Sequence, residues 1–239
     1  MRTLFALLAV CALSGTMQAA TYFDATGDID PGIANGGGTL DIVSMEVTHT
    51  PSDLIFALTV NGNVGTVDWG KFMIGIATAK TLGTPTGNGW GRPINLVTNI
   101  GGTDYGMNYW LGAWVDGGGG AQLWNYDNGL ASWSGPAALA GYTFTPGAQS
   151  LVTYTVARSA LDLTGGDLFF FDAYSSGGGG TDSAVDALAN PNVSITAWDS
   201  VYTSRAPNLN SYLIPEPATL SVLGIAALAL VRLPRRARR

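Results

Sequence analysis

The sequence is poor in the side chains that build disulfide bridges, zinc sites and catalytic triads. Among its 239 residues there is one cysteine, Cys11, and one histidine, His49. A single cysteine cannot form an internal disulfide, and a zinc site would lack its usual thiolate and imidazole ligands. A Ser-His-Asp triad would have to include His49, and the sequence has no Gly-x-Ser-x-Gly nucleophile motif. The composition therefore argues against these classes of protein.

Basic residues and glutamate are scarce in residues 21–213, which we expect to form the mature domain. This segment has five Lys or Arg and sixteen Asp or Glu, which gives a net charge of about −11, and Glu46 is its only glutamate. The negative charge disfavours binding to nucleic acid, whose phosphates attract cationic surfaces. A glycosidase needs two opposed carboxylates, which here would have to be found among the aspartates.

Residues 1–20 have the three-part pattern of a secretory signal peptide. Arg2 supplies the basic start, residues 4–13 form an apolar run, and small residues stand at Ala19 and Ala20. We expect cleavage after one of these two alanines. Cys11 would be removed with the signal peptide, which leaves a mature protein without cysteine.

Residues 214–239 form a second three-part pattern. Pro215, Glu216 and Pro217 come first, and the apolar run 218–231 follows. The prolines predict an extended, accessible strip before a helix. A helix over this run is short of the roughly 20 residues that span a bilayer comfortably. The chain ends on a basic cluster that would stay on the cytoplasmic side: Arg232, Arg235, Arg236, Arg238 and Arg239.

This order of segments resembles the PEP-CTERM sorting signal of Gram-negative bacteria. The resemblance implies recognition by an exosortase, a membrane transpeptidase-like protease, with processing near Pro215-Glu216-Pro217. It also implies export by the general secretion machinery, a transient anchor in the inner membrane, and delivery to the cell surface or the exopolysaccharide matrix. The alternatives are an ordinary C-terminal anchor and a buried core helix, but a core helix would not end in five arginines.

The pattern of residues 21–213 predicts one all-β domain. The alternating runs 43–47 and 54–60 predict an antiparallel hairpin that turns at Pro51-Ser52-Asp53. Six further strands are predicted at 72–77, 110–115, 122–126, 151–156, 168–174 and 193–198, and residues 158–163 carry a weak helix signal. Eight strands in a domain of this size predict a two-sheet antiparallel β-sandwich, jelly-roll-like, between the signal helix and a short C-terminal hydrophobic helix.

Two segments of the body resemble carbohydrate-binding module family 9 and the related DOMON sandwiches. One is Phe23-Asp24-Ala25-Thr26-Gly27-Asp28-Ile29-Asp30, which precedes the predicted hairpin. The other is 154–161, followed by a turn and the Phe-rich run of 165–172. The resemblance implies a β-sandwich that contacts a partner through an exposed face.

Tryptophan is abundant, with seven in the chain, and an indole offers an apolar face on which sugar rings stack. Trp110 and Trp114 are an even number of residues apart, so they would share one face of a strand. Trp90 and Trp133 lie in stretches rich in Gly, Pro and Ser, where we expect exposure. The candidate glycan-binding residues are Trp90, Trp110, Trp114, Trp124 and Trp133. Burial in the core is the alternative for each of them.

Acidic residues gather near the start of the predicted domain. Asp24, Asp28 and Asp30 form a turn whose carboxylates suit Ca²⁺, which prefers oxygen ligands. The turn is not an EF-hand loop, because no glutamate stands at the closing position, and solvated turn residues are the alternative. Asp182 and Asp186, in a glycine-rich loop, are a second candidate.

Three functions remain open from the sequence. The favoured one is a non-catalytic, exported surface or matrix protein whose sandwich contacts exopolysaccharide. The second is a structural matrix component without a ligand. The third is a secreted carbohydrate-active enzyme.

Overall fold

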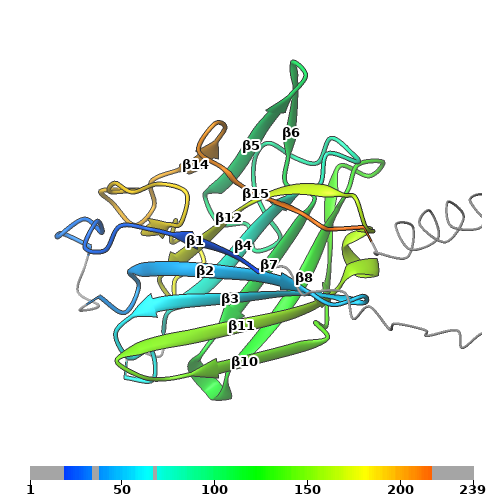
Figure 1. The fold of residues 1–239 in the computed structure, drawn as a ribbon. Coiled ribbons are helices and arrows are strands. Elements are labelled where there is room, and N and C mark those ends of the chain that lie inside the picture. The colour runs from blue at the N-terminus through cyan, green and yellow to red at the C-terminus, as the bar shows by residue number, and fades with distance from the viewer. Residues whose placement is uncertain (1–18, 34–37, 67–68, 217–239) are drawn as a thin grey trace, which may run out of the picture.

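The computed structural model describes residues 19–33, 38–66 and 69–216, and these are almost entirely β-structure (Figure 1). Antiparallel sheets pack together and confirm the predicted β-sandwich. Most of the predicted signal peptide, Pro217, the apolar run 218–231 and the five C-terminal arginines lie outside the described residues.

The first sheet has five strands and lies in front in Figure 1. In order across the sheet they are β1 (Ala20–Phe23), β2 (Ile42–His49), β3 (Asp53–Asn61), β11 (Gln149–Ala157) and β10 (Gly141–Thr145). β2 and β3 form the predicted antiparallel hairpin, with Met45 opposite Leu58 and Val47 opposite Phe56. β3 is buried at every second residue, which explains why its sequence alternates so clearly.

The second sheet lies behind the first (Figure 1). Its order is β13 (Asp186–Ala187), β12 (Leu168–Ser176), β4 (Lys71–Ala77), β7 (Tyr109–Trp114), β8 (Gly120–Asp127) and β9 (Ser132–Ala137), and β15 (Asn210–Leu213) also pairs with β12. A third, small sheet consists of β14 (Tyr202–Arg205), β5 (Ile94–Ile100) and β6 (Thr103–Gly106). β14 pairs with β5 in parallel. The fold is therefore not antiparallel throughout, although the sequence had predicted an antiparallel sandwich.

The main core lies between the two large sheets. The Phe56 ring packs edge-on against Phe169 and Phe171, with ring centroids 6.1 and 6.2 Å apart. The buried Tyr154 of β11 crosses to the second sheet, where its hydroxyl donates to the carbonyl of Phe72 at 2.9 Å. Burial of these aromatic side chains supplies much of the hydrophobic free energy that holds the sandwich together.

The opposite face of the second sheet is also covered. Since side chains alternate along a strand, Trp110 of β7 and Tyr174 of β12 point away from the first sheet, and both are fully buried. Their rings stack with centroids 5.9 Å apart. Tyr174 also contacts Tyr202 of the small sheet, at 6.1 Å. The third layer therefore buries part of a face that a simple sandwich would leave in solvent.

One local prediction was wrong, and one was confirmed only in part. Residues 193–198 form no strand, and Ile195 is instead the buried residue of an irregular segment. The helix signal at 158–163 corresponds to one 3₁₀ turn, η2 (Arg158–Leu161). The sequence reading also missed the short edge strands β1, β9, β10, β13 and β15 and the whole of the small sheet, β5, β6 and β14.

Candidate functional site

Four tryptophans gather on the outer face of the second sheet, near its β8 side. Trp110 and Trp124 are direct partners on β7 and β8, and Trp114 lies further along β7 on the same face. Trp90 comes from the connection between β4 and β5 and packs against both β7 tryptophans, with ring centroids 6.3 Å from Trp110 and 6.5 Å from Trp114. This group combines residues from strands and from one long connection.

Glycine makes room for this group. A Cβ atom at Gly112 would lie 2.2 Å from Trp90 Cζ2, and one at Gly89 would lie 2.4 Å from Trp124 Cγ. Gln122, opposite Gly112 on β8, then fixes two of the indoles. Its Oε1 accepts hydrogen bonds from Trp90 Nε1 at 3.1 Å and Trp124 Nε1 at 3.2 Å. The two rings are thus held by packing and by a shared acceptor.

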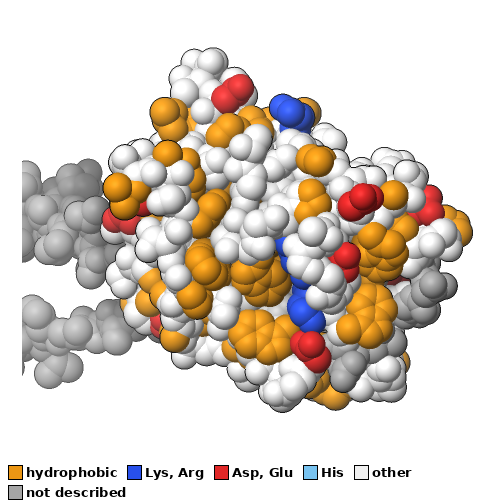
Figure 2. Space-filling view, turned by 180° about the vertical axis from the view of Figure 1, so that it is seen from behind, with side chains coloured by type: hydrophobic (Ala, Val, Ile, Leu, Met, Phe, Trp, Pro, Cys, Tyr) orange, Lys and Arg blue, Asp and Glu red, His pale blue; other side chains and the backbone are white. Residues whose placement is uncertain are grey.

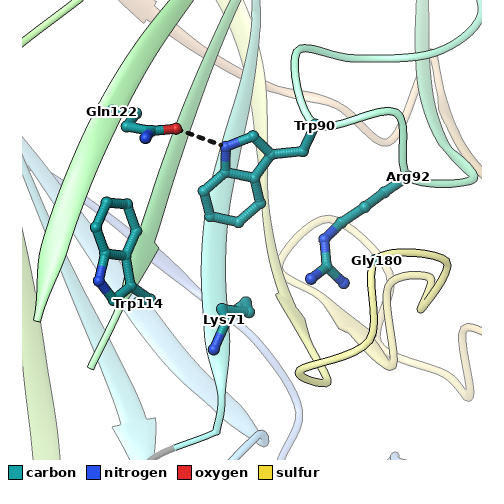
Figure 3. A pocket seen from close by; sticks show the side chains of 6 residues that line it. All are labelled: Lys71, Trp90, Arg92, Trp114, Gln122 and Gly180. Carbon is teal, nitrogen blue, oxygen red and sulfur yellow. Dashed lines mark hydrogen bonds between the residues drawn. The ribbon is translucent and has the colours of Figure 1, made fainter. Parts of the chain in front are cut away.

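An open pocket of about 320 Å³ lies beside Trp90 and Trp114 (Figure 3). The two indoles face the same space, Gln122 lies between them at one end, and Lys71 lies at the other. The lining residues are Lys71, Trp90, Arg92, Trp114, Gln122 and Gly180. On this face of the molecule, hydrophobic side chains lie on both sides of a short column of basic side chains (Figure 2).

The pocket carries two cations in different environments. Lys71 Nζ forms an ion pair with Asp116 Oδ1 at 3.0 Å and donates to the carbonyl of Trp69. Arg92 is 5% exposed, and its guanidinium lies 5.6 Å from the centre of the Trp90 ring. It donates to Ser176 Oγ at 2.7 Å and to backbone carbonyls of the 177–182 loop.

Arg92 is a buried cation without a carboxylate in contact. Among the described residues the ion pairs are Lys71–Asp116 and Lys80–Asp167, and neither includes Arg92. Burial lowers the pKa of its guanidinium, the direction expected when a charge leaves water. Its Nε is buried and has no hydrogen-bond partner among the described residues. The charge of Asp182 acts on Arg92 from a distance and partly offsets the effect of burial on its pKa.

The predicted tryptophans divide between the pocket and its surroundings. Trp90 and Trp114 line the pocket, and Trp124 supports it through Gln122. The prediction for Trp110 was wrong, because its ring is fully buried under Trp90 and Tyr174 and cannot meet a sugar. Trp133 packs on Tyr126, 5.5 Å away, and does not line the pocket.

The sequence reading missed the polar residues of the site. Gln122 is two residues before Trp124 on the same strand, so alternation could have placed it on the tryptophan face. Arg92 follows Trp90 by two residues, but the segment is irregular. Spacing there does not show which side chains point in the same direction. Lys71 comes to lie opposite Trp114 because β4 pairs with β7, and this pairing cannot be deduced from the spacing of the two residues in the sequence.

Asp24 and Asp28 do lie close together, but their third neighbour is Asp186 and not Asp30. One carboxylate oxygen from each of these three residues lies within 4.8 Å of the others. Asp30 instead accepts the backbone N–H of Gly32 within its own turn. Burial raises the pKa of Asp24 to about 7 and that of Asp186 to about 9, and the neighbouring carboxylates add to both shifts.

Asp182 does not join Asp186 in a common site. Its side chain accepts the backbone N–H of Gly179 at 2.7 Å, inside the glycine-rich loop. Asp186 lies in β13, where its carboxylate accepts the backbone N–H groups of Ile42 and Ala187. Asp182 and Asp186 therefore do not form the second calcium site that the sequence predicted.

The start of the predicted sorting segment is partly folded onto the domain. Ile214 is fully buried, its N–H donates to Asp167 at 2.9 Å, and its carbonyl accepts from Gly166 at 2.8 Å. Pro215 is partly buried and Glu216 is exposed. The expectation of an accessible strip is thus wrong for Ile214, and accessibility begins at Glu216 within the described residues.

Comparison with known proteins found no match to a family model, to a curated protein or to a solved structure. No helix among the described residues is long and apolar enough to cross a membrane. The resemblances drawn from the sequence therefore remain predictions.

Proposed function

We propose that the domain is a non-catalytic glycan-binding module, exported and then sorted to the cell surface or the exopolysaccharide matrix. The observation that carries this proposal is the open pocket lined by the indoles of Trp90 and Trp114. Apolar aromatic faces combined with a few fixed polar groups are what recognition of a sugar ring requires. The side chains of Gln122, Lys71 and Arg92 provide such polar groups within the same pocket.

The charge of the pocket favours an acidic glycan. Residues 21–213 contain only five basic side chains, and two of them, Lys71 and Arg92, line this pocket. The rest of the domain is strongly acidic and would repel a polyanion. A uronic-acid residue could stack on an indole while its carboxylate approaches the cations, so that binding is confined to this one place on the surface.

Catalysis is less well supported than binding. The described residues that line the pocket include no carboxylate, and the neighbouring Asp116 is engaged by Lys71 at 3.0 Å. Glycoside hydrolysis normally uses two carboxyl groups that face each other across the scissile bond. The lining is suited to holding a saccharide but not to cleaving one.

Export and sorting are supported by the two terminal patterns, residues 1–20 and 214–239. The described domain fits this route because its last strand, β15, pairs with β12 and its chain becomes exposed at Glu216. A protease acting beyond Ile214 would leave every strand of the sandwich in place.

A panel of soluble polysaccharides tests the binding proposal. We expect the purified protein to be retarded in affinity electrophoresis by polyuronates such as alginate or polygalacturonate, and less by neutral dextran. No retardation by any polysaccharide would favour the structural alternative. Release of reducing sugar from the same polymers would favour the enzyme.

A further inference from the structure

A second site lies where the N-terminal turn meets the edge of the second sheet. Asp24 and Asp28 belong to the turn after β1, and Asp186 belongs to β13, which pairs with β12. Oxygens of these three carboxylates lie within 4.8 Å of one another. Three like charges at such distances repel strongly once burial removes the screening water.

A fourth carboxylate lies against the same turn. Asp41 is only 3% exposed, and its Oδ2 accepts the N–H of Gly27, inside the turn, and the side-chain amide of Asn61. Its charge acts on both Asp24 and Asp28. Its other oxygen, Oδ1, is buried and has no hydrogen-bond partner among the described residues. Asp41 is therefore a buried carboxylate with only one of its two oxygens satisfied.

The turn carboxylates are unsatisfied in the same way. Among the described residues, Asp24 Oδ2 and both oxygens of Asp28 are buried and have no hydrogen-bond partner. With Asp41 Oδ1, four carboxylate oxygens in or beside the turn lack donors in this part of the chain, although buried polar atoms are normally paired. Backbone N–H groups donate hydrogen bonds to the other oxygen of Asp24, to the other oxygen of Asp41 and to both oxygens of Asp186. A divalent cation would attract these carboxylates together and satisfy the oxygens that lack donors.

We propose that Asp24, Asp28 and Asp186 bind one Ca²⁺ ion beside the buried carboxylate of Asp41. Calcium takes six to eight oxygen ligands in flexible geometry, and carboxylates and water can supply them. Mg²⁺ demands a tighter octahedron and keeps most of its water, while Zn²⁺ prefers nitrogen and sulfur ligands. The only histidine, His49, contacts Tyr212 instead, with 2.7 Å between Nδ1 and the hydroxyl oxygen.

The ion joins two parts of the chain that are far apart in sequence, because it fixes the turn 24–28 to the second sheet through Asp186. Asp41, just before β2, holds the same turn by accepting the N–H of Gly27. This role is structural and independent of the glycan pocket. Calcium should therefore stabilise the fold whether or not the domain binds a glycan.

Calorimetric titration and thermal unfolding of the purified full chain, after treatment with EDTA, test this site. We expect CaCl₂ to bind at one site per chain and to raise Tm by about 5 °C at a concentration about 100-fold above Kd. MgCl₂ at the same concentration should shift Tm much less. No calcium binding, or an equal shift with magnesium, would overturn the assignment.

Two matched variants locate the ion. Asp28→Asn should weaken calcium binding at least tenfold, because neither oxygen of this carboxylate has a hydrogen-bond partner among the described residues. Asp30→Asn, two residues away and outside the group, should bind as the unmodified chain does. If Asp28→Asn does not fold, Asp24→Asn replaces it with the same expectation. Unchanged calcium affinity in the folded variant, or an equal loss in Asp30→Asn, would refute the site.

Discussion

The Trp90 indole occupies the space that a side chain at position 112 would need. A Cβ atom on Gly112 would lie 2.2 Å from Trp90 Cζ2, well inside van der Waals contact. Position 112 is in the middle of β7, where glycine weakens a strand and requires a reason. Here the reason is the close approach of an indole that forms one wall of the pocket.

Gly112→Ala should therefore damage both the fold and the pocket. The added methyl group must push Trp90 away from β7, and overpacking of this kind costs about 1–3 kcal/mol of unfolding free energy. Chemical denaturation measures the loss, and tryptophan fluorescence should report the displaced ring. Gly141→Ala is the control, because its Cβ would meet Thr155 at an ordinary 3.4 Å. Equal stability of the two variants would show that Trp90 moves aside at no cost.

Lys71→Gln should reduce binding of a polyuronate more than binding of any neutral glycan. The substitution removes one cation and leaves the charge of Asp116, its partner at 3.0 Å, facing the pocket. The wild-type affinity for a polyuronate should also fall as NaCl is raised, since salt screens exposed charges, and the variant should respond less steeply. Affinity electrophoresis at two salt concentrations measures both effects. A salt-independent affinity would contradict a role for charge.

The buried Asp172 should make the fold less stable as the pH rises. Burial raises its pKa to about 7, although Ser204, Ala189 and Ala173 donate hydrogen bonds that oppose the shift. The folded pKa is above the unfolded value near 4, so this group stabilises the fold most below about pH 4. That contribution, about 4 kcal/mol in total, is lost as the pH rises to about 7.

Asp172→Asn should remove this part of the pH dependence. The amide oxygen can still accept from Ala173 and Ala189, and its NH₂ group can donate to Ser204 Oγ, which then donates to Tyr174. The free energy of unfolding at pH 5 and pH 8 should therefore differ less in the variant than in the wild type. Parallel curves for the two proteins would show that Asp172 is charged throughout this range or does not affect folding.

Glu216→Ala should block processing of the C-terminal segment. If recognition resembles that of the sorting family, the variant should stay at full length in the inner-membrane fraction, whereas the wild type should lose everything beyond roughly Pro217. Glu46→Ala is the control for the loss of one negative charge, because Glu46 is also exposed but lies in β2, outside the sorting segment. Intact-mass measurement of surface-located protein decides the matter, because a retained Arg239 terminus there would contradict processing.

The sequence predicted those parts of the fold that depend on neighbours along the chain. The hairpin β2–β3 is clear because Leu54, Phe56 and Leu58 alternate with partly buried residues over a single buried face. Residues 193–198 gave a similar pattern for another reason. There Ile195 is buried and the Trp198 ring packs on Trp69, with centroids 6.2 Å apart. These two apolar side chains hold an irregular segment in place, and their spacing in the sequence resembles that of a strand.

Contacts between distant segments could not be predicted in this way. Asp24 and Asp28 were found because they share a turn, but Asp41 and Asp186 join them only through the packing of β2 and β13 near that turn. Trp110 was misassigned because the sequence does not show that Trp90 and Tyr174 cover its strand face. β9 (Ser132–Ala137), mostly exposed and with Gly-Pro inside it, has no strand pattern at all.

The most direct test of glycan binding compares two tryptophan variants of the full chain. Trp114→Ala removes one wall of the pocket, and Trp133→Ala removes a partly buried tryptophan of the same sheet that does not line it. Titration calorimetry with a polyuronate oligosaccharide should show at least about tenfold weaker binding for Trp114→Ala, the loss of one stacking contact, and wild-type affinity for Trp133→Ala. Unchanged affinity in a folded Trp114→Ala protein, or equal losses in both variants, would contradict binding at this pocket.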